Sequence, residues 1–188
     1  MQALLPGRVA WYATGRFYVT ESGEIFDAGY FLHLAPVDGD LFCAKPPSET
    51  TAHFTFLADP FKVTTSVTNG DLSLGVDPVG DFTLYFAEEP AGNFDDPNTF
   101  GCGTAIARFR RVSIVVGVTV QGSVTTNVFS AELLESQPFT FRGGTYDLKD
   151  ALPHGITQSG IASTVAITPP PGKYTTVIPF VGSAIAVG

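Results

Sequence analysis

Histidine, the side chain that most often transfers protons near neutral pH, occurs at only three positions of this 188-residue chain. His154 stands between Pro153 and Gly155 in a segment that we expect to form a loop, with Asp147 and Asp150 nearby along the chain. A carboxylate beside an imidazole ring favours its charged form, which suits general acid or base catalysis. If the protein is an enzyme, His154 is the predicted catalytic residue. Otherwise it is a residue of a surface loop.

The other two histidines, His33 and His53, fall on predicted strands. Both lie on the face opposite the apolar one, so we expect both to be exposed. Their separation along the chain matches no common pattern of metal ligands, and we predict no bound metal. The sequence contains no Gly-x-Ser-x-Gly nucleophile motif, no phosphate-binding loop and no dinucleotide-binding glycine pattern. We therefore expect any reaction to proceed without a cofactor.

The arginine side chains of the long predicted strand Thr104–Val120 could point either into or out of the predicted barrel. The apolar face of this strand changes from odd to even positions at Arg110–Arg111. A β-bulge at this point would leave Arg108 outside the sheet in a structural role. A continuous register would point Arg108 and Arg110 inward, where they need a carboxylate partner or an anionic ligand. We favour the bulge, and the inward case makes Arg108 a candidate ligand-binding residue.

Aromatic side chains give the second set of candidate ligand-binding residues. Those predicted to face inward are Trp11, Phe17, Tyr30, Phe54, Phe56, Phe82 and Phe86. Such a set either fills the core of a small barrel completely or lines a cavity for an apolar ligand. The sequence leaves both alternatives open, because it does not reveal the volume inside the barrel.

The elements that position these residues are predicted to be many short strands. Runs rich in Val, Ile, Thr, Phe and Tyr are separated by turns that draw on 20 Gly and 14 Pro residues. The predicted strands are Val9–Thr20, Ile25–Leu34, Thr51–Ala58, Phe61–Thr68, Leu72–Val76, Asp81–Ala87, Thr104–Val120, Ser123–Leu133, Phe139–Arg142, Ile161–Thr168 and Lys173–Val181. Between the ninth and tenth of these, we expect Gly143–Gly160 to form a loop.

Sequential hairpins of this kind are compatible with an antiparallel barrel or with a two-layer β-sandwich. The long, glycine-containing strands favour the barrel, because glycine eases the sharp bends of a curved sheet. We predict an all-β fold, a single antiparallel β-barrel domain over residues 1–188, and keep the sandwich as the alternative.

One segment adds a resemblance. Phe100–Phe109 reads Phe-Gly-Cys-Gly-Thr-Ala-Ile-Ala-Arg-Phe, a Gly-x-Gly-Thr sequence that leads into a strand with small residues on one face. It resembles the dirigent type of barrel, and the architecture is similar to calycin-like barrels, allene oxide cyclases and bacterial polyketide cyclases. The resemblance covers this segment alone and implies a fold, not a function. The lipocalin Gly-x-Trp pattern is absent; Gly15-Arg16-Phe17 is the nearest match.

The charge balance restricts the partners. The chain has 10 Lys and Arg against 18 Asp and Glu, a net charge of −8. A phosphate backbone or an anionic membrane surface requires a basic patch, so we expect neither nucleic acid nor membrane as a partner. The first residues show no secretory signal, and we expect Cys43 and Cys102 to be reduced thiols in a cytoplasmic protein.

Two functions fit these features. The first is a barrel that binds an apolar small molecule and, as an enzyme, would cyclise or isomerise it without a cofactor. The second is a structural or assembly protein, such as a coat or accessory subunit that forms homo-oligomers. Low charge and the apolar segment Ile178–Val187 favour this second function.

The C-terminal segment must be covered in either case. Tyr174–Gly188 has no charged side chain, so left free it would be an aggregation-prone β-segment. We expect Lys173–Phe180 to close the sheet as its last strand. Pro179 cannot donate a backbone hydrogen bond, which predicts a position at an edge or a bulge.

Overall fold

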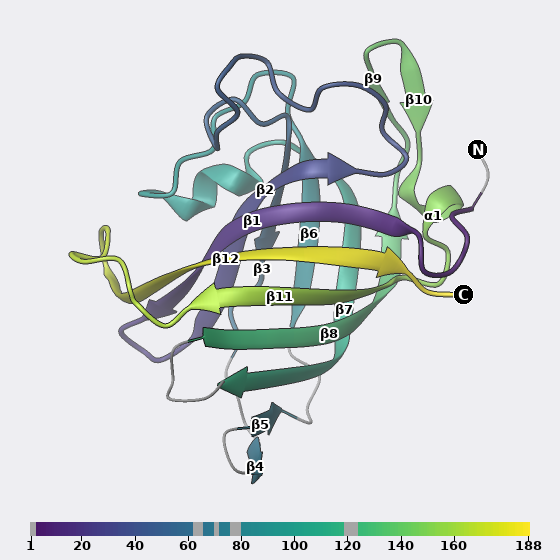
Figure 1. Cartoon of the computed structure of the whole chain (residues 1–188). Coiled ribbons are helices and arrows are strands. Elements are labelled where there is room, and N and C mark those ends of the chain that lie inside the picture. Colours follow the sequence, from purple (N-terminus) through teal and green to yellow (C-terminus); the bar gives the residue numbers. More distant parts are fainter. Residues whose placement is uncertain (1–2, 62–65, 70–71, 76–79, 119–123) are drawn as a thin grey trace.

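The computed structural model describes residues 3–61, 66–69, 72–75, 80–118 and 124–188. It is an all-β protein built on one antiparallel barrel of eight strands (Figure 1). Around the barrel the order is β7-β6-β3-β2-β1-β12-β11-β8, and β8 pairs with β7 to close it. The predicted barrel is therefore confirmed, and the β-sandwich is excluded.

The barrel strands are β1 (Val9–Thr20), β2 (Ile25–Leu34), β3 (Phe54–Ala58), β6 (Asp81–Phe86), β7 (Thr104–Val118), β8 (Val124–Ser136), β11 (Ile156–Ser163) and β12 (Tyr174–Ala186). Outside it lie the hairpin of β4 (Ser66–Asn69) and β5 (Leu72–Gly75), the hairpin of β9 (Phe139–Phe141) and β10 (Gly144–Tyr146), the 3-10 helix η1 (Pro97–Gly101) and the short helix α1 (Leu148–Ala151). No helix in the described part of the chain has the length and hydropathy needed to cross a bilayer.

The first hairpin shows how the sequence makes a barrel wall. β1 and β2 have the predicted bounds, and Gly15 lies opposite Gly29 in their ladder. A Cβ atom at Gly15 would lie 2.9 Å from Cζ of Phe180, and one at Gly29 would lie 2.7 Å from Cζ of Phe56. The glycine pair therefore makes room inside the barrel for two aromatic rings.

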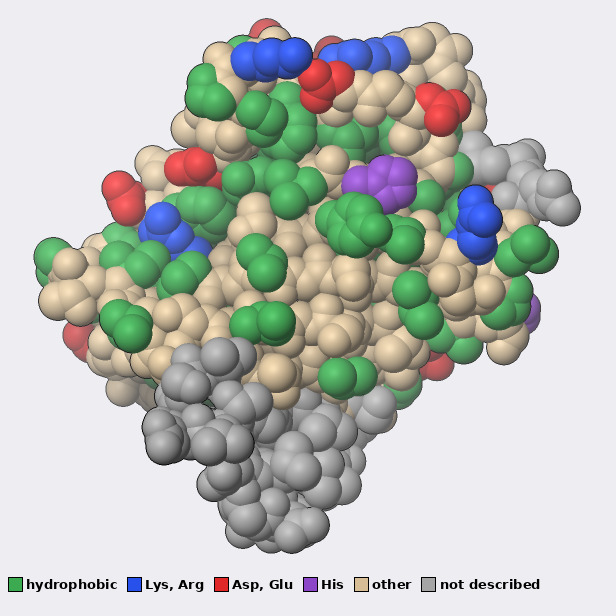
Figure 2. Space-filling view, viewed as in Figure 1, with side chains coloured by type: hydrophobic (Ala, Val, Ile, Leu, Met, Phe, Trp, Pro, Cys, Tyr) green, Lys and Arg blue, Asp and Glu red, His purple; other side chains and the backbone are tan. Residues whose placement is uncertain are grey.

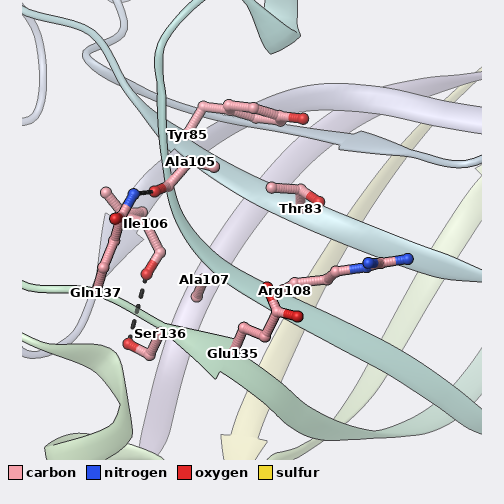
Figure 3. Close-up of a pocket in the computed structure, with 9 residues that line it drawn as sticks. All are labelled: Thr83, Tyr85, Ala105, Ile106, Ala107, Arg108, Glu135, Ser136 and Gln137. Atoms are coloured by element: carbon pink, nitrogen blue, oxygen red, sulfur yellow. Dashed lines mark hydrogen bonds between the residues drawn. The ribbon is translucent and has the colours of Figure 1, made fainter.

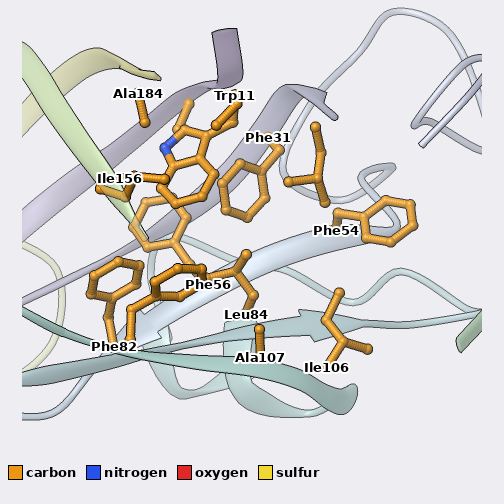
Figure 4. Close-up of a cluster of buried hydrophobic side chains, with 14 of the residues drawn as sticks. Trp11, Phe31, Phe54, Phe56, Phe82, Leu84, Ile106, Ala107, Ile156 and Ala184 are labelled. Carbon is orange, nitrogen blue, oxygen red and sulfur yellow. The ribbon is translucent and has the colours of Figure 1, made fainter. Parts of the chain in front are cut away.

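Aromatic rings fill the interior around Trp11 (Figure 4). The indole packs edge-on against Phe31 and Phe109, with ring centroids 5.6 and 5.7 Å apart. At one end of the barrel Phe54 packs against Phe86 and against Phe141 of the β9–β10 hairpin, at 5.2 and 5.0 Å. The hairpin therefore closes this end with apolar side chains.

A second layer covers part of the outer wall. The segment that contains η1 lies over β1, β2 and β3, where the hydroxyl of Tyr18 donates to the carbonyl of Phe94 at 2.8 Å and that of Thr55 to Phe100 at 2.6 Å. Tyr30 packs under this layer, with its ring 6.1 Å from that of Phe94. The prediction that Tyr30 faces inward is wrong, because the covered outer face of β2 is as apolar as the inner one.

The segment before β11 differs from the prediction. The expected loop Gly143–Gly160 contains β10, α1 and the first half of β11. Gln158 and Gly160 occupy inward positions of β11, so this half of the strand lacks the apolar alternation that marks a strand in sequence. The parts of the predicted strands at residues 62–65, 76, 119–120 and 123 lie outside the described residues.

The C-terminal segment forms strand β12, which lies between β1 and β11 in the barrel. β12 pairs with β1 on one side and β11 on the other, which confirms that this segment completes the sheet. Pro179 lies opposite Arg16, one residue outside the stretch of β12 that pairs with β11, which ends at Phe180. Pro179 therefore lies beyond the end of the β11 ladder, but within a continuous stretch of the β1 ladder and not at a bulge.

Removing β12 tests its structural role. We expect a chain that ends at Pro171 to lose cooperative thermal unfolding, because β1 and β11 become unpaired edges and buried Val177 and Phe180 are lost. Calorimetry with near-ultraviolet circular dichroism measures this. A chain that ends at Ala186 keeps β12 and serves as the control. A soluble Pro171 truncation with an unchanged melting temperature would contradict the expectation.

Candidate functional site

A buried ion pair lies inside the aromatic barrel. Nη2 of Arg111 donates to both carboxylate oxygens of Asp27, at 2.7 and 2.9 Å, and the two side chains are only 4% and 7% exposed. The guanidinium also lies over the rings of Phe82 and Phe129, at 4.9 and 5.0 Å from their centroids. The rings and the carboxylate together replace the water that a free guanidinium would bind.

Strand alternation places Arg111 there, two residues after the inward Phe109, and a β-bulge follows it. The β7–β8 register shifts between Arg111 and Ser113, so the predicted bulge is confirmed. Arg108 and Arg110 lie outside the barrel, where they contact the carboxylate of Asp81 at 2.7 and 3.0 Å. Sequence reasoning missed that Arg111 is the inward charge. The available signal was Asp27, an acidic residue in an otherwise apolar strand that needs a basic partner.

Further polar groups surround this pair. Nε1 of Trp11 donates to Oε1 of Gln158 at 3.0 Å, and Asn127 is buried nearby. Nη1 of Arg111 is the one buried side-chain nitrogen or oxygen of the described residues that has no hydrogen-bond partner. Two enclosed cavities of about 10 and 20 Å³ adjoin the ion pair. Each is large enough for about one water molecule, and small-molecule sites need roughly 300 Å³ or more.

In the described part of the barrel, the inward members of the predicted aromatic set therefore pack around or beside these two small cavities. Trp11, Phe56 and Phe82 line the smaller cavity and Phe17 lines the larger one. Phe54 and Phe86 pack beneath the β9–β10 hairpin. A ligand-binding role for these residues stays a prediction, and neither interior cavity offers the volume for it.

A groove of about 330 Å³ lies instead between β6, β7 and β8 (Figure 3). Its lining residues are Thr83, Tyr85, Ala105, Ile106, Ala107, Arg108, Glu135, Ser136 and Gln137. Thr83, Arg108 and Glu135 are register partners across the three strands. Both ladders of β7 are irregular here, with shifts at Leu84/Tyr85 and at Arg108/Phe109. Such irregularities re-aim side chains and are frequent beside binding sites.

Hydrogen bonds fix one wall of the groove. The Gln137 amide donates to the carbonyl of Ala105, and the hydroxyl of Ser136 contacts the carbonyl of Ile106 and the carboxylate of Asp147 (Figure 3 shows the first two). Arg108 is held by Asp81. Glu135 is exposed, and none of the ion pairs between described residues includes it. Its carboxylate is therefore the unpaired charge at the groove.

The histidines lie elsewhere. His154 is exposed after α1 and lines neither the groove nor the interior cavities. Asp147, its expected neighbour, instead pairs with Lys149 at 3.0 Å. A catalytic role for His154 stays a prediction that no geometry in the described residues supports.

His33 is exposed as expected, whereas His53 is half-buried, so the second expectation is wrong. The ring of His53 hydrogen-bonds the carbonyl of Ala87 at 2.8 Å, and the β9–β10 hairpin covers it through Phe141. Within the described ranges, no three His, Cys, Asp or Glu side chains form a cluster that would hold a metal ion.

Comparisons with protein-family models, with curated proteins and with solved structures give no significant match. The function must therefore be argued from the residues and their geometry.

A double-mutant cycle tests the buried pair. Asp27→Leu or Arg111→Met alone should lower the free energy of unfolding by about 3–5 kcal/mol, because each leaves an unpaired buried charge. The double variant should be far less destabilised, since neither charge remains. Urea unfolding measured by fluorescence gives the values. Additive effects of the two substitutions would show that the pair does not interact.

The outer ion cluster predicts a pH dependence. The hydrogen bond from Arg110 lowers the pKa of Asp81 below its ordinary value. A lowered folded-state pKa stabilises the fold above the unfolded value of about 3.9, and this contribution disappears as pH falls through the folded value. Asp81→Asn should therefore cost about 2 kcal/mol at pH 7 and almost nothing in strong acid.

Urea unfolding between pH 2 and 7 checks this expectation. Asp59→Asn is the matched control, because Asp59 is 67% exposed and lies 3.7 Å from Arg108. A difference between wild type and Asp81→Asn that stays constant with pH would refute the assignment.

Proposed function

We propose that the protein binds a small organic molecule in the groove between β6, β7 and β8. The observation that carries the proposal is volume combined with convergent polar groups. The groove offers about 330 Å³, within the range of small-molecule sites, whereas the interior cavities offer about 10 and 20 Å³. Another surface hollow of about 310 Å³ is lined by Thr20, Glu21, Ser22 and Lys173, which include no apolar residue.

The lining of the groove indicates the class of ligand. Ala105 supplies exposed apolar surface above the buried Ile106 and Ala107, and Tyr85 supplies an aromatic side chain at the same site. The unpaired carboxylate of Glu135 accepts hydrogen bonds, and Arg108 is paired with Asp81, which also binds Arg110, and with Asp59. A ligand with an apolar, flat body and one hydroxyl or ammonium group fits this combination. An anionic ligand fits poorly, because it would face Glu135.

The proposal is for binding without a reaction. No histidine lines the groove, and the hydroxyl of Ser136 is engaged by Asp147. Although desolvation raises the pKa of Asp147, hydrogen bonds from Ser136 and Lys149 hold it below its ordinary value, so this carboxylate is a weak general base for the Ser136 hydroxyl. Binding is the part of the small-molecule hypothesis that this geometry favours, over cyclisation or isomerisation.

Titration of the ¹⁵N-labelled protein with benzylamine, benzyl alcohol and benzoate tests the groove. We expect the first two probes to shift the amide resonances of residues 105–107 and 135–137, and benzoate to leave them unchanged. A dissociation constant of about 1 mM is expected for probes of this size. Shifts that map to the barrel interior, or no shift at the groove at about 10 mM probe, would overturn the proposal.

Two variants that each remove one negative charge test whether Glu135 recognises the ligand. Glu135→Gln should weaken benzylamine binding at least about fivefold, because the ammonium group loses its carboxylate partner. It should leave benzyl alcohol nearly unaffected, since an amide oxygen still accepts a hydrogen bond. Glu132→Gln is the matched control, an exposed glutamate of the same strand that does not line the groove. Equal effects of the two variants would count against Glu135 as the recognising group.

A further inference from the structure

The outer faces of β1, β12, β11 and β8 form a continuous surface, which we call the uncharged wall. Three rows of outward residues cross these strands in register: Thr14, Val181, Ile161 and Thr126; Tyr12, Ser183, Ser159 and Val128; and Val9, Ile185, Thr157 and Ser130. None of them is charged. In Figure 2 this region is green and tan, with blue and red side chains towards its margins.

The apolar members of the wall are exposed to an unusual degree. Val181 and Ile161, which lie opposite each other, are 55% and 54% exposed, and Tyr12, Val128 and Ile185 each exceed 40%. Elsewhere on the barrel, parts of the outer surface are covered or charged. The η1 segment covers the wall at β2 and β3, and Arg108, Arg110 and Asp81 form the ion cluster over β6 and β7. Exposed contiguous apolar surface on a folded domain marks an interaction site.

We propose that the uncharged wall is an interface between copies of this chain. A two-fold interface brings the same patch against itself, so a charged patch would oppose like charges. This wall avoids that penalty in a molecule whose net charge is −8. A partner recognised by charge would find no complementary group among these rows.

The size of the wall agrees with a second copy. Four strands about 4.8 Å apart, over the five or six residues of about 3.4 Å each that the rows span, cover roughly 350 Å² in projection. Side chains that stand off the sheet raise the accessible area towards the roughly 600 Å² that each partner contributes to the smallest stable interfaces. An interface of this size without charged contacts is expected to be weak, so the test covers micromolar concentrations.

The wall is separate from the groove. Residues 126–130 of β8 belong to the wall, whereas Glu135 and Ser136 at the end of the same strand belong to the groove. The association of copies therefore does not depend on the proposed small-molecule binding. Each can fail without the other.

Sedimentation velocity of the full chain from about 1 to 100 μM tests the interface. We expect a concentration-dependent dimer that becomes tighter between 50 and 500 mM NaCl, because salt screens the repulsion between the two net charges. Val181→Glu and Ile161→Glu should each weaken association at least tenfold. Val165→Glu is the control, because Val165 is 74% exposed but lies outside the three rows.

Circular dichroism establishes that each variant is folded. Should either apolar substitution disturb folding, Ser159→Glu introduces the charge at an exposed polar position of the same wall. Dissociation by the wall variants with an unchanged Val165→Glu variant supports the interface. A wild-type monomer at 100 μM in high salt, or a dimer that these wall variants leave intact, would overturn it.

Discussion

The ion pair of Arg111 and Asp27 is the constraint around which the barrel is arranged. The two residues belong to β7 and β2, strands that are separated by β6 and β3, so the pair joins opposite parts of the wall through the interior. A slip of one residue in either strand would turn its charged side chain to the other face and leave its partner buried and unpaired. The cost of such a slip, several kcal/mol, is greater than the net stability that the intact pair supplies. We therefore expect the pair to contribute more to register than to net stability.

Filling the interior in this way moves the candidate binding sites to the outside. Phe82 and Phe129 must lie against the guanidinium, and Trp11 must reach Gln158, so the space in which a barrel of this size holds a ligand is taken by side chains. Regular alternation along β7 turns Ala107, Phe109 and Arg111 inward and leaves Arg108 and Arg110 outside with Asp81. One short stretch of strand thus separates an internal charge from an external charge cluster.

Sequence reasoning predicts those parts of the fold that depend on local pattern. β1 and β2 are predictable because their strands are long, their turn contains glycine and their alternation is regular. The direction of Tyr30 is not, because a layer more than fifty residues away covers the outer face of β2 and makes both faces apolar. The inward direction of Arg111 was missed, because it depends on Asp27 in a distant strand and not on the pattern of β7 itself. The start of β11 is not predictable for a related reason. Gln158 is polar but faces inward, because Trp11 donates a hydrogen bond to its side chain.

The candidate sites were less accessible from sequence than the fold. The groove exists because two ladders of β7 shift register next to each other, and such shifts leave no mark in residue type. Arg108 lines the groove from the outer face of β7, whereas it was a candidate ligand-binding residue only for the case in which it points inward. The uncharged wall, by contrast, follows from pattern once the barrel is known. Its outward positions alternate with core positions along four strands, and all of them are Thr, Ser, Val, Ile or Tyr.

Strand β8 connects the two outer sites and separates their electrostatics. Its outward residues change from Thr126, Val128 and Ser130 to Glu132 and Glu135, so one strand carries both an uncharged and an acidic section. Salt must act on the two sections in opposite directions. Screening weakens the attraction of a cationic ligand for Glu135, whereas it reduces the repulsion between two copies of net charge −8 that meet at the wall. Ionic strength should therefore shift the two proposed occupancies in opposite directions.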